Sequence, residues 1–111
     1  MNIQQQLEQI LIEVDKISAD AYNAKVQMEV AKRKRKSLIP VLATQYEGSE
    51  SMRDRLARSH KDYLAQVAEC QKAELDFGVK WAKWEALQIK LSACQTLNKL
   101  MKTDYDTGSF K

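Results

Sequence analysis

A heptad pattern of apolar residues runs through the first third of the sequence. Starting at Ile3, mostly apolar side chains recur in alternating steps of four and three as far as Leu42, and only Arg35 interrupts the series. A repeat of about 3.5 residues is typical of a left-handed coiled coil. The pattern predicts one long helix over residues 2–46. We call its twelve positions the N-terminal seam: Ile3, Leu7, Ile10, Val14, Ile17, Ala21, Ala24, Met28, Ala31, Arg35, Leu38 and Leu42.

Pro40 and Gly48 indicate where this helix bends and where it stops. Pro40 lies inside the heptad pattern, where it removes one backbone hydrogen bond, so we expect a kink near the end of the helix. A turn is predicted over residues 47–51, because Gly48 suits a left-handed helix stop. Ser51 and Asp54 resemble a capping box for a second helix over residues 51–102.

The two predicted helices are expected to fold back on each other. Residues whose numbers sum to 98 would then face each other, as Leu42 would face Leu56 and Leu7 would face Leu91. The predicted fold is all-α: a long antiparallel two-helix coiled-coil hairpin over residues 1–103, forming one domain. Residues 104–111 have no periodicity and predict a disordered tail.

The second predicted helix carries more apolar surface than one neighbouring helix can cover. Its first stripe consists of Trp84, Leu87, Leu91, Cys94 and Met101. Its second stripe consists of Leu75, Val79, Ala82, Ala86, Ile89, Ala93, Leu97 and Leu100. A homodimer that forms a four-helix bundle would cover the surplus face. We expect its interface to involve Phe77, Trp81, Trp84, Leu87 and Leu91, with burial in the chain's own core as the alternative.

Composition excludes most other classes of protein. Three glycines and one proline among 111 residues are too few for the frequent turns of sandwiches, barrels and α/β folds. The chain has one histidine and no glycine-rich loop, and its carboxylates are scattered along the sequence. This pattern predicts no catalytic group of residues. We therefore expect no enzyme activity and no cofactor. We also expect no metal site, because no second histidine or cysteine lies at a ligand spacing from His60.

The cysteines and the N-terminus favour the cytoplasm as the compartment. Cys70 and Cys94 lie 24 positions apart, which is about 36 Å along one helix and too far for a disulfide. Residues 1–6 lack the features of a signal peptide. The longest apolar run, residues 38–43, is too short to span a membrane. A cytoplasmic protein without membrane contact is expected.

Positive charge is concentrated in the middle of the chain. Residues 1–31 carry two basic and five acidic groups, whereas residues 32–62 carry nine basic and four acidic groups. The consecutive run at 32–36 could neutralise phosphates, so nucleic-acid binding is one interpretation and a solvated helix surface is the other. The candidate phosphate-binding residues are Lys32, Arg33, Lys34, Lys36, Arg53, Arg55 and Arg58.

Charged residues at seam positions indicate how the register of the hairpin is fixed. Arg35 lies at a core position, where it is expected to bond to Tyr63 or Asp62. Glu74 is expected to pair with Lys25 in the same way.

Several short stretches resemble a family of small helical proteins of tailed phages and prophages. They are residues 59–64 (SHKDYL), 85–88 (EALQ), 94–98 (CQTLN) and the basic-then-apolar stretch 33–38 (RKRKSL). The resemblance covers about residues 20–102, and Pro40 departs from the uninterrupted helix of that family. It implies an all-helical protein of uncharacterised activity, of a kind often encoded near phage recombination and single-strand-binding genes. We therefore expect a non-enzymatic accessory protein of phage DNA metabolism, or a modulator of a host factor, that binds a phage or host protein in the host cytoplasm. The alternative function is nucleic-acid binding through the basic residues.

Overall fold

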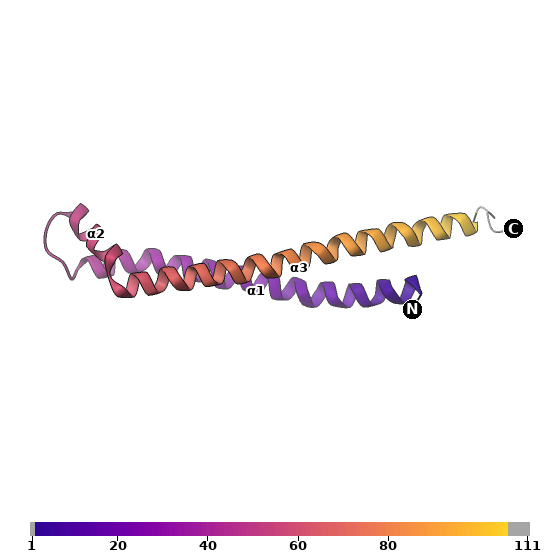
Figure 1. Ribbon diagram of the computed structural model, residues 1–111, viewed down its shortest axis with the longest axis horizontal. Coiled ribbons are helices and arrows are strands. Elements are labelled where there is room, and N and C mark those ends of the chain that lie inside the picture. Colours follow the sequence, from indigo (N-terminus) through magenta and orange to yellow (C-terminus); the bar gives the residue numbers. More distant parts are fainter. Residues whose placement is uncertain (1, 107–111) are drawn as a thin grey trace. The chain divides into compact units, whose positions relative to one another are not determined.

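The protein is helical almost throughout. Its computed structural model describes the backbone of residues 2–106 and the side chains of residues 2–102. The helices are α1 (Ile3–Ala43), α2 (Glu50–Ser59) and α3 (Lys61–Asp106), and residues 2–106 contain no strand (Figure 1). The all-α prediction is confirmed.

Helix α1 runs through Pro40 and ends at Ala43, three residues before the predicted end. The chain leaves the helix through hydrogen bonds that span three residues, from the Gln45 amide to the Leu42 carbonyl at 3.0 Å and from the Tyr46 amide to the Ala43 carbonyl at 3.2 Å. The Thr44 hydroxyl donates to the Val41 carbonyl at 2.6 Å. These bonds satisfy carbonyl groups that the end of a helix would otherwise leave unpaired.

The N-terminus of α2 is capped by Ser49 rather than by the predicted Ser51. Ser49 has extended backbone angles, and its hydroxyl accepts a hydrogen bond from the Met52 amide at 3.2 Å, which is the geometry of an N-cap. Gly48 precedes it with a φ of +119°, a value that side-chain-bearing residues rarely adopt. The capping serine is therefore the one that directly follows the glycine.

The helix predicted over residues 51–102 is divided at His60. The backbone of His60 is extended, and its amide donates to the Ala57 carbonyl at 3.2 Å, closing α2. Its Nδ1 atom accepts a hydrogen bond from the Asp62 amide at 3.0 Å, so the imidazole caps the start of α3. A histidine thus takes the capping role that sequence patterns assign to Ser, Thr, Asp or Asn. The C-terminal end also differs, because α3 includes residues 104–106 of the expected tail; residues 107–111 lie outside the described residues.

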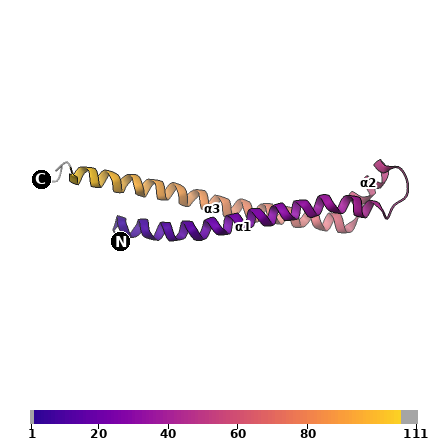
Figure 2. The same ribbon diagram turned by 180° about the vertical axis from the view of Figure 1, so that it is seen from behind.

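The chain divides into two compact units. We call residues 22–79 the loop unit, and residues 1–21 with 80–111 the terminal unit. In the loop unit, the chain leaves α1, turns through residues 44–49 and returns through α2 and the first part of α3 beside α1 (Figures 1 and 2). Each unit therefore contains one part of α1 and one part of α3, and the loop unit also contains α2.

The core of the terminal unit is a small apolar cluster contributed by both helices. Leu7 and Ile10 from α1 and Leu91 from α3 are buried together, and Val14 and Cys94 pack against them half-buried. Leu7 and Leu91 are a pair that the sequence register predicts to meet. The contact therefore agrees with the predicted register in this unit.

In the loop unit, polar side chains join α1 to α3. The Gln66 side-chain amide donates to the Ala31 carbonyl at 3.1 Å, one position from the predicted pairing of Ala31 with Val67. Lys32 Nζ lies 3.6 Å from Glu74 Oε1. The ion pair that was predicted for Glu74 with Lys25 is therefore wrong, because Lys32 takes that place.

The N-terminal seam identifies the packed face of α1 correctly. All twelve of its positions are buried or half-buried, including Arg35. Within the part of the chain that the structure describes, no hydrogen bond or ion pair joins Arg35 to Tyr63 or Asp62, its expected partners. Asp62 instead lies near His60, with 3.8 Å between its Oδ2 and the imidazole Nδ1.

Candidate interaction surfaces

One face of α3 exposes the second stripe. All eight of its positions are exposed, and among its large side chains Ile89 at 73% and Leu75 at 70% have the largest exposed fractions. In the terminal unit the stripe comprises Ala82, Ala86, Ile89, Ala93, Leu97 and Leu100. At 3.6 residues per turn these residues share one side of the helix, roughly opposite to Trp84 and Leu91. Helix α3 of the terminal unit therefore has two apolar faces, of which the chain itself covers one.

The predicted oligomer interface is divided between packed and exposed positions. Leu91 is buried in the terminal-unit core, and Trp84 and Leu87 are half-buried. Trp81 is 40% exposed; its indole lies 4.7 Å from that of Trp84 between ring centroids, and its Nε1 donates to Glu85 Oε1 at 2.8 Å. Leu91 thus packs within its own chain, which is the alternative that the sequence left open for it.

Phe77 and Gly78 lie in the loop unit. Phe77 is half-buried, so it also has little surface to offer to another molecule. A Cβ atom built on Gly78 would have no heavy atom within 4 Å. Packing inside the chain therefore does not require glycine at this position of α3.

The predicted phosphate-binding residues differ in how they are engaged. Lys32 pairs with Glu74, and Arg58 Nε lies 3.7 Å from Asp54 Oδ2. Arg53 is half-buried, and its Nε atom is buried without a hydrogen-bond partner in the described part of the chain. Four residues are exposed and form no ion pair with any described residue: Arg33, Lys34, Lys36 and Arg55.

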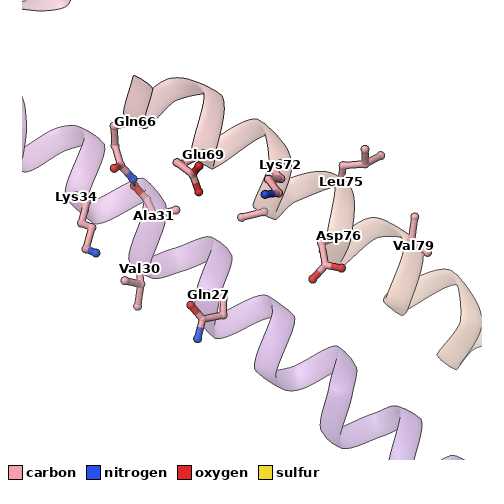
Figure 3. A pocket seen from close by; sticks show the side chains of 11 residues that line it. Gln27, Val30, Ala31, Lys34, Gln66, Glu69, Lys72, Leu75, Asp76 and Val79 are labelled. Carbon is pink, nitrogen blue, oxygen red and sulfur yellow. Dashed lines mark hydrogen bonds between the residues drawn. The ribbon is translucent and has the colours of Figure 1, made fainter. Parts of the chain in front are cut away.

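An open groove of about 680 Å³ lies between α1 and α3 in the loop unit. Figure 3 shows Val30, Ala31 and Lys34 on the α1 side, with Leu75 and Val79 on the α3 side. The hydrogen bond from Gln66 to Ala31 crosses between the two helices near one end of the groove. The remaining lining residues are Gln27, Glu69, Lys72, Ala73 and Asp76.

A second hollow of about 470 Å³ adjoins this groove and shares Val30, Lys34 and Gln66 with it. Its other lining residues are Arg33, Ser37, Leu38 and Val41, so its lining contains no acidic residue. The two hollows together form one surface, which we call the loop-unit groove. Its charged groups at the Val41 end are all basic, whereas the carboxylates of Glu69 and Asp76 line the other hollow together with Lys72.

The sequence interpretation identified only part of this groove. It singled out Arg33 and Lys34 for their charge, but not Val30 and Val41, which lie outside the seam. These two valines are eleven residues apart, close to three helical turns, so they share a side of α1. That spacing could have indicated an apolar strip on this side of α1. It does not reveal which part of α3 lies beside the two valines.

Other kinds of site have little support among the described residues. No three His, Cys, Asp or Glu side chains come together there as a metal site. None of the helices has a stretch both long and apolar enough to cross a bilayer. Cys70 is buried and Cys94 half-buried, and both are free thiols.

Comparisons of the chain with protein-family models, with curated proteins and with solved structures found no match.

Proposed function

We propose that this protein is a non-enzymatic helical accessory protein that acts through protein–protein interaction. Its two long helices form an antiparallel coiled-coil hairpin, and two hairpins associate into a four-helix bundle. The observation that carries the proposal is the exposed second stripe on α3, on the face of the helix turned away from its contact with α1. A helix with two apolar faces is typical of a position between neighbours on both sides.

The free energy available from burying this face is of the same order as the cost of self-association. Ile89, Leu97 and Leu100 are each at least half exposed in the terminal unit. Full burial of one such side chain contributes about 1.5–3 kcal/mol. These three side chains are 73%, 50% and 57% exposed, so only about three-fifths of each is left to bury. Burying that part of three side chains from each copy supplies roughly 5–10 kcal/mol, which is comparable to the cost of association of about 4–15 kcal/mol.

The residue sizes along the stripe also suit a neighbouring helix. The small side chains of Ala82, Ala86 and Ala93 lie along the same stripe as the large ones of Ile89, Leu97 and Leu100. Small side chains leave room for the large ones of a facing helix, so two helices can approach closely without voids. A second copy supplies a face with the same mixture of small and large side chains.

The biological role that we propose follows from the resemblance to helical phage proteins. The bundle would act as an accessory of phage DNA metabolism or as a modulator of a host factor, by presenting a surface to a phage or host protein in the host cytoplasm. The exposed residues of the loop-unit groove are the natural place for that contact.

The experiment that tests self-association compares two substitutions on α3 by sedimentation velocity. Ile89→Glu places a charge at the centre of the second stripe, and we expect it to convert dimer to monomer. Ser92→Glu adds the same charge at an exposed position outside the stripe and should leave the dimer intact. Circular dichroism at 222 nm verifies that both variants remain helical. Equal sedimentation of the two variants would contradict the proposal.

The second candidate function is nucleic-acid binding through the basic residues of α1. It is favoured by Arg33, Lys34 and Lys36, which are exposed and form no ion pair with described residues. Contacts of this kind give binding that weakens steeply with salt and ignores sequence. Gel shifts with single- and double-stranded DNA at low salt test it. Binding by the wild type but not by a variant with Gln at 32, 33, 34 and 36 would favour this function over a purely protein-binding one.

A further inference from the structure

Small and large side chains are unevenly placed along the second stripe of the terminal unit. The small residues are Ala82, Ala86 and Ala93, and the large ones are Ile89, Leu97 and Leu100. All six are exposed. Two of the three small residues precede every large one, and two of the three large residues follow every small one. The fit between two such stripes therefore depends on the relative direction of the two helices.

A parallel pair of α3 helices would place each residue of the stripe opposite the same residue of the second copy. Ala82 would meet a second alanine, and Leu100 would meet a second leucine. Layers of two small side chains would then follow layers of two large ones along the contact. A single spacing between the helices cannot pack both kinds of layer, so voids form at the alanines or the leucines are crowded.

An antiparallel pair of α3 helices avoids this conflict. When residues whose numbers sum to 182 or 183 face each other, every small side chain meets a large one. The three pairs are Ala82 with Leu100, Ala86 with Leu97 and Ile89 with Ala93. A shift by one heptad loses the match, because it places Ala82 against Ala93 in one direction and Ile89 against Leu100 in the other. Side-chain size therefore favours one direction and one register.

Charged residues beside the stripe have different neighbours in the two directions. One edge of the stripe carries Glu85, Ser92 and Lys99 at intervals of seven residues. The other edge carries Lys83 and Lys90 at the same interval. The antiparallel register brings Glu85 close to Lys99 of the second copy, whereas a parallel contact brings it close to Lys90 of the second copy. The partner of Glu85 thus reports the direction of the helices.

We propose that two copies of this chain associate through an antiparallel contact between their α3 helices, with the two-fold axis at the level of residue 91. Each small–large pair then occurs twice, as an interface with two-fold symmetry requires. Two ion pairs between Glu85 and Lys99 flank the contact. The two copies of Lys90 lie near the axis and extend their ammonium groups into solvent. The proposal rests on the self-association proposed above and adds its direction and register.

Distances between spin labels on the two copies test the direction. Single labels are attached through Lys83→Cys or Ser92→Cys, both at exposed positions, in a full chain that carries Cys70→Ala and Cys94→Ala. In the antiparallel dimer, labels at position 83 lie about 24 Å apart along the helices, and labels at position 92 about 3 Å apart. With about 10 Å between the helix axes, the distance measured by electron paramagnetic resonance should be about 15 Å longer at 83 than at 92. A parallel dimer gives nearly equal distances at both positions.

Charge exchange tests the same register without changing the cysteines. Glu85→Lys alone should raise the dimer dissociation constant about tenfold, because it turns two attractions into repulsions. Adding Lys99→Glu should return the constant to within about threefold of the wild type, whereas adding Lys90→Glu should not. Both double variants lack the 2.8 Å hydrogen bond from Trp81 Nε1 to Glu85 Oε1, so its loss cancels in the comparison. Sedimentation equilibrium measures the dissociation constants.

The outcomes separate the direction of the contact from self-association itself. Nearly equal label distances at the two positions, or recovery with Lys90→Glu instead of Lys99→Glu, overturn the antiparallel contact while self-association stands. A dimer that neither double variant restores has its contact elsewhere and also overturns it. A wild-type chain that sediments as a monomer overturns both proposals. If the cysteine-free chain does not dimerise, the charge variants decide alone.

Discussion

Replacing Leu91 by alanine tests whether the terminal unit is held together by the cluster that the structure places there. Leu91 is only 9% exposed and packs with Leu7 and Ile10. Leu→Ala in a buried core costs about 2–5 kcal/mol, from lost burial and from the cavity left behind. The cluster here is thin, and its half-buried members Val14 and Cys94 can relax into the space. We therefore expect the lower part of that range, about 2–3 kcal/mol.

The matched substitution is Leu97→Ala, which removes the same atoms from a side chain that is 50% exposed. No cavity forms there and alanine favours the helix, so we expect less than about 0.5 kcal/mol in the monomer. The free energies of unfolding of both variants are measured by urea denaturation, followed by circular dichroism at 222 nm. The protein concentration is chosen so that sedimentation shows a monomer. The Leu91 variant should also melt about 8–12 °C below the wild type. Equal destabilisation by the two substitutions would refute the division into a packed and an exposed face.

Three further substitutions test individual features of the structure. Gly78→Ala should stabilise the monomer by about 0.5–1 kcal/mol, because alanine is the better helix former and its Cβ meets open space; lower stability in thermal melts of the monomer would contradict this. His60→Ala should cost about 1 kcal/mol through loss of the cap on α3, and His60→Asp should recover it, both measured by urea unfolding. Gln66→Ala should cost about 0.5–1.5 kcal/mol by removing the bond to the Ala31 carbonyl, whereas the exposed Gln71→Ala should not.

Heptad periodicity predicted the helical fold and the packed face of α1 well. A repeat of apolar residues specifies which side of a helix is buried, and every position of the N-terminal seam is at least half-buried. The break at His60 was not predictable in the same way. It contains neither glycine nor proline, and its cap is an imidazole nitrogen rather than a hydroxyl or carboxylate. The cap at Ser49 was missed because Ser49 and Ser51 both follow Gly48 closely, and only backbone angles distinguish them.

The candidate surfaces were predictable only in part. The sequence showed that α3 carries two apolar stripes, but a stripe does not state which neighbour covers it. Leu91 was therefore proposed for the oligomer interface, whereas Leu7 and Ile10 of the same chain cover it. The loop-unit groove depends on residues near 30 and near 75 lying side by side. Such long-range placement comes from the tertiary structure and not from any local pattern.

Sedimentation equilibrium of the wild-type chain from about 1 to 100 µM tests the central claim most directly, because a second copy is proposed to cover the exposed face of α3. We predict a mass of twice 12.8 kDa at the upper concentrations, with dissociation on dilution. A mass of 12.8 kDa over the whole range would contradict the account, since the second stripe would then remain uncovered in solution.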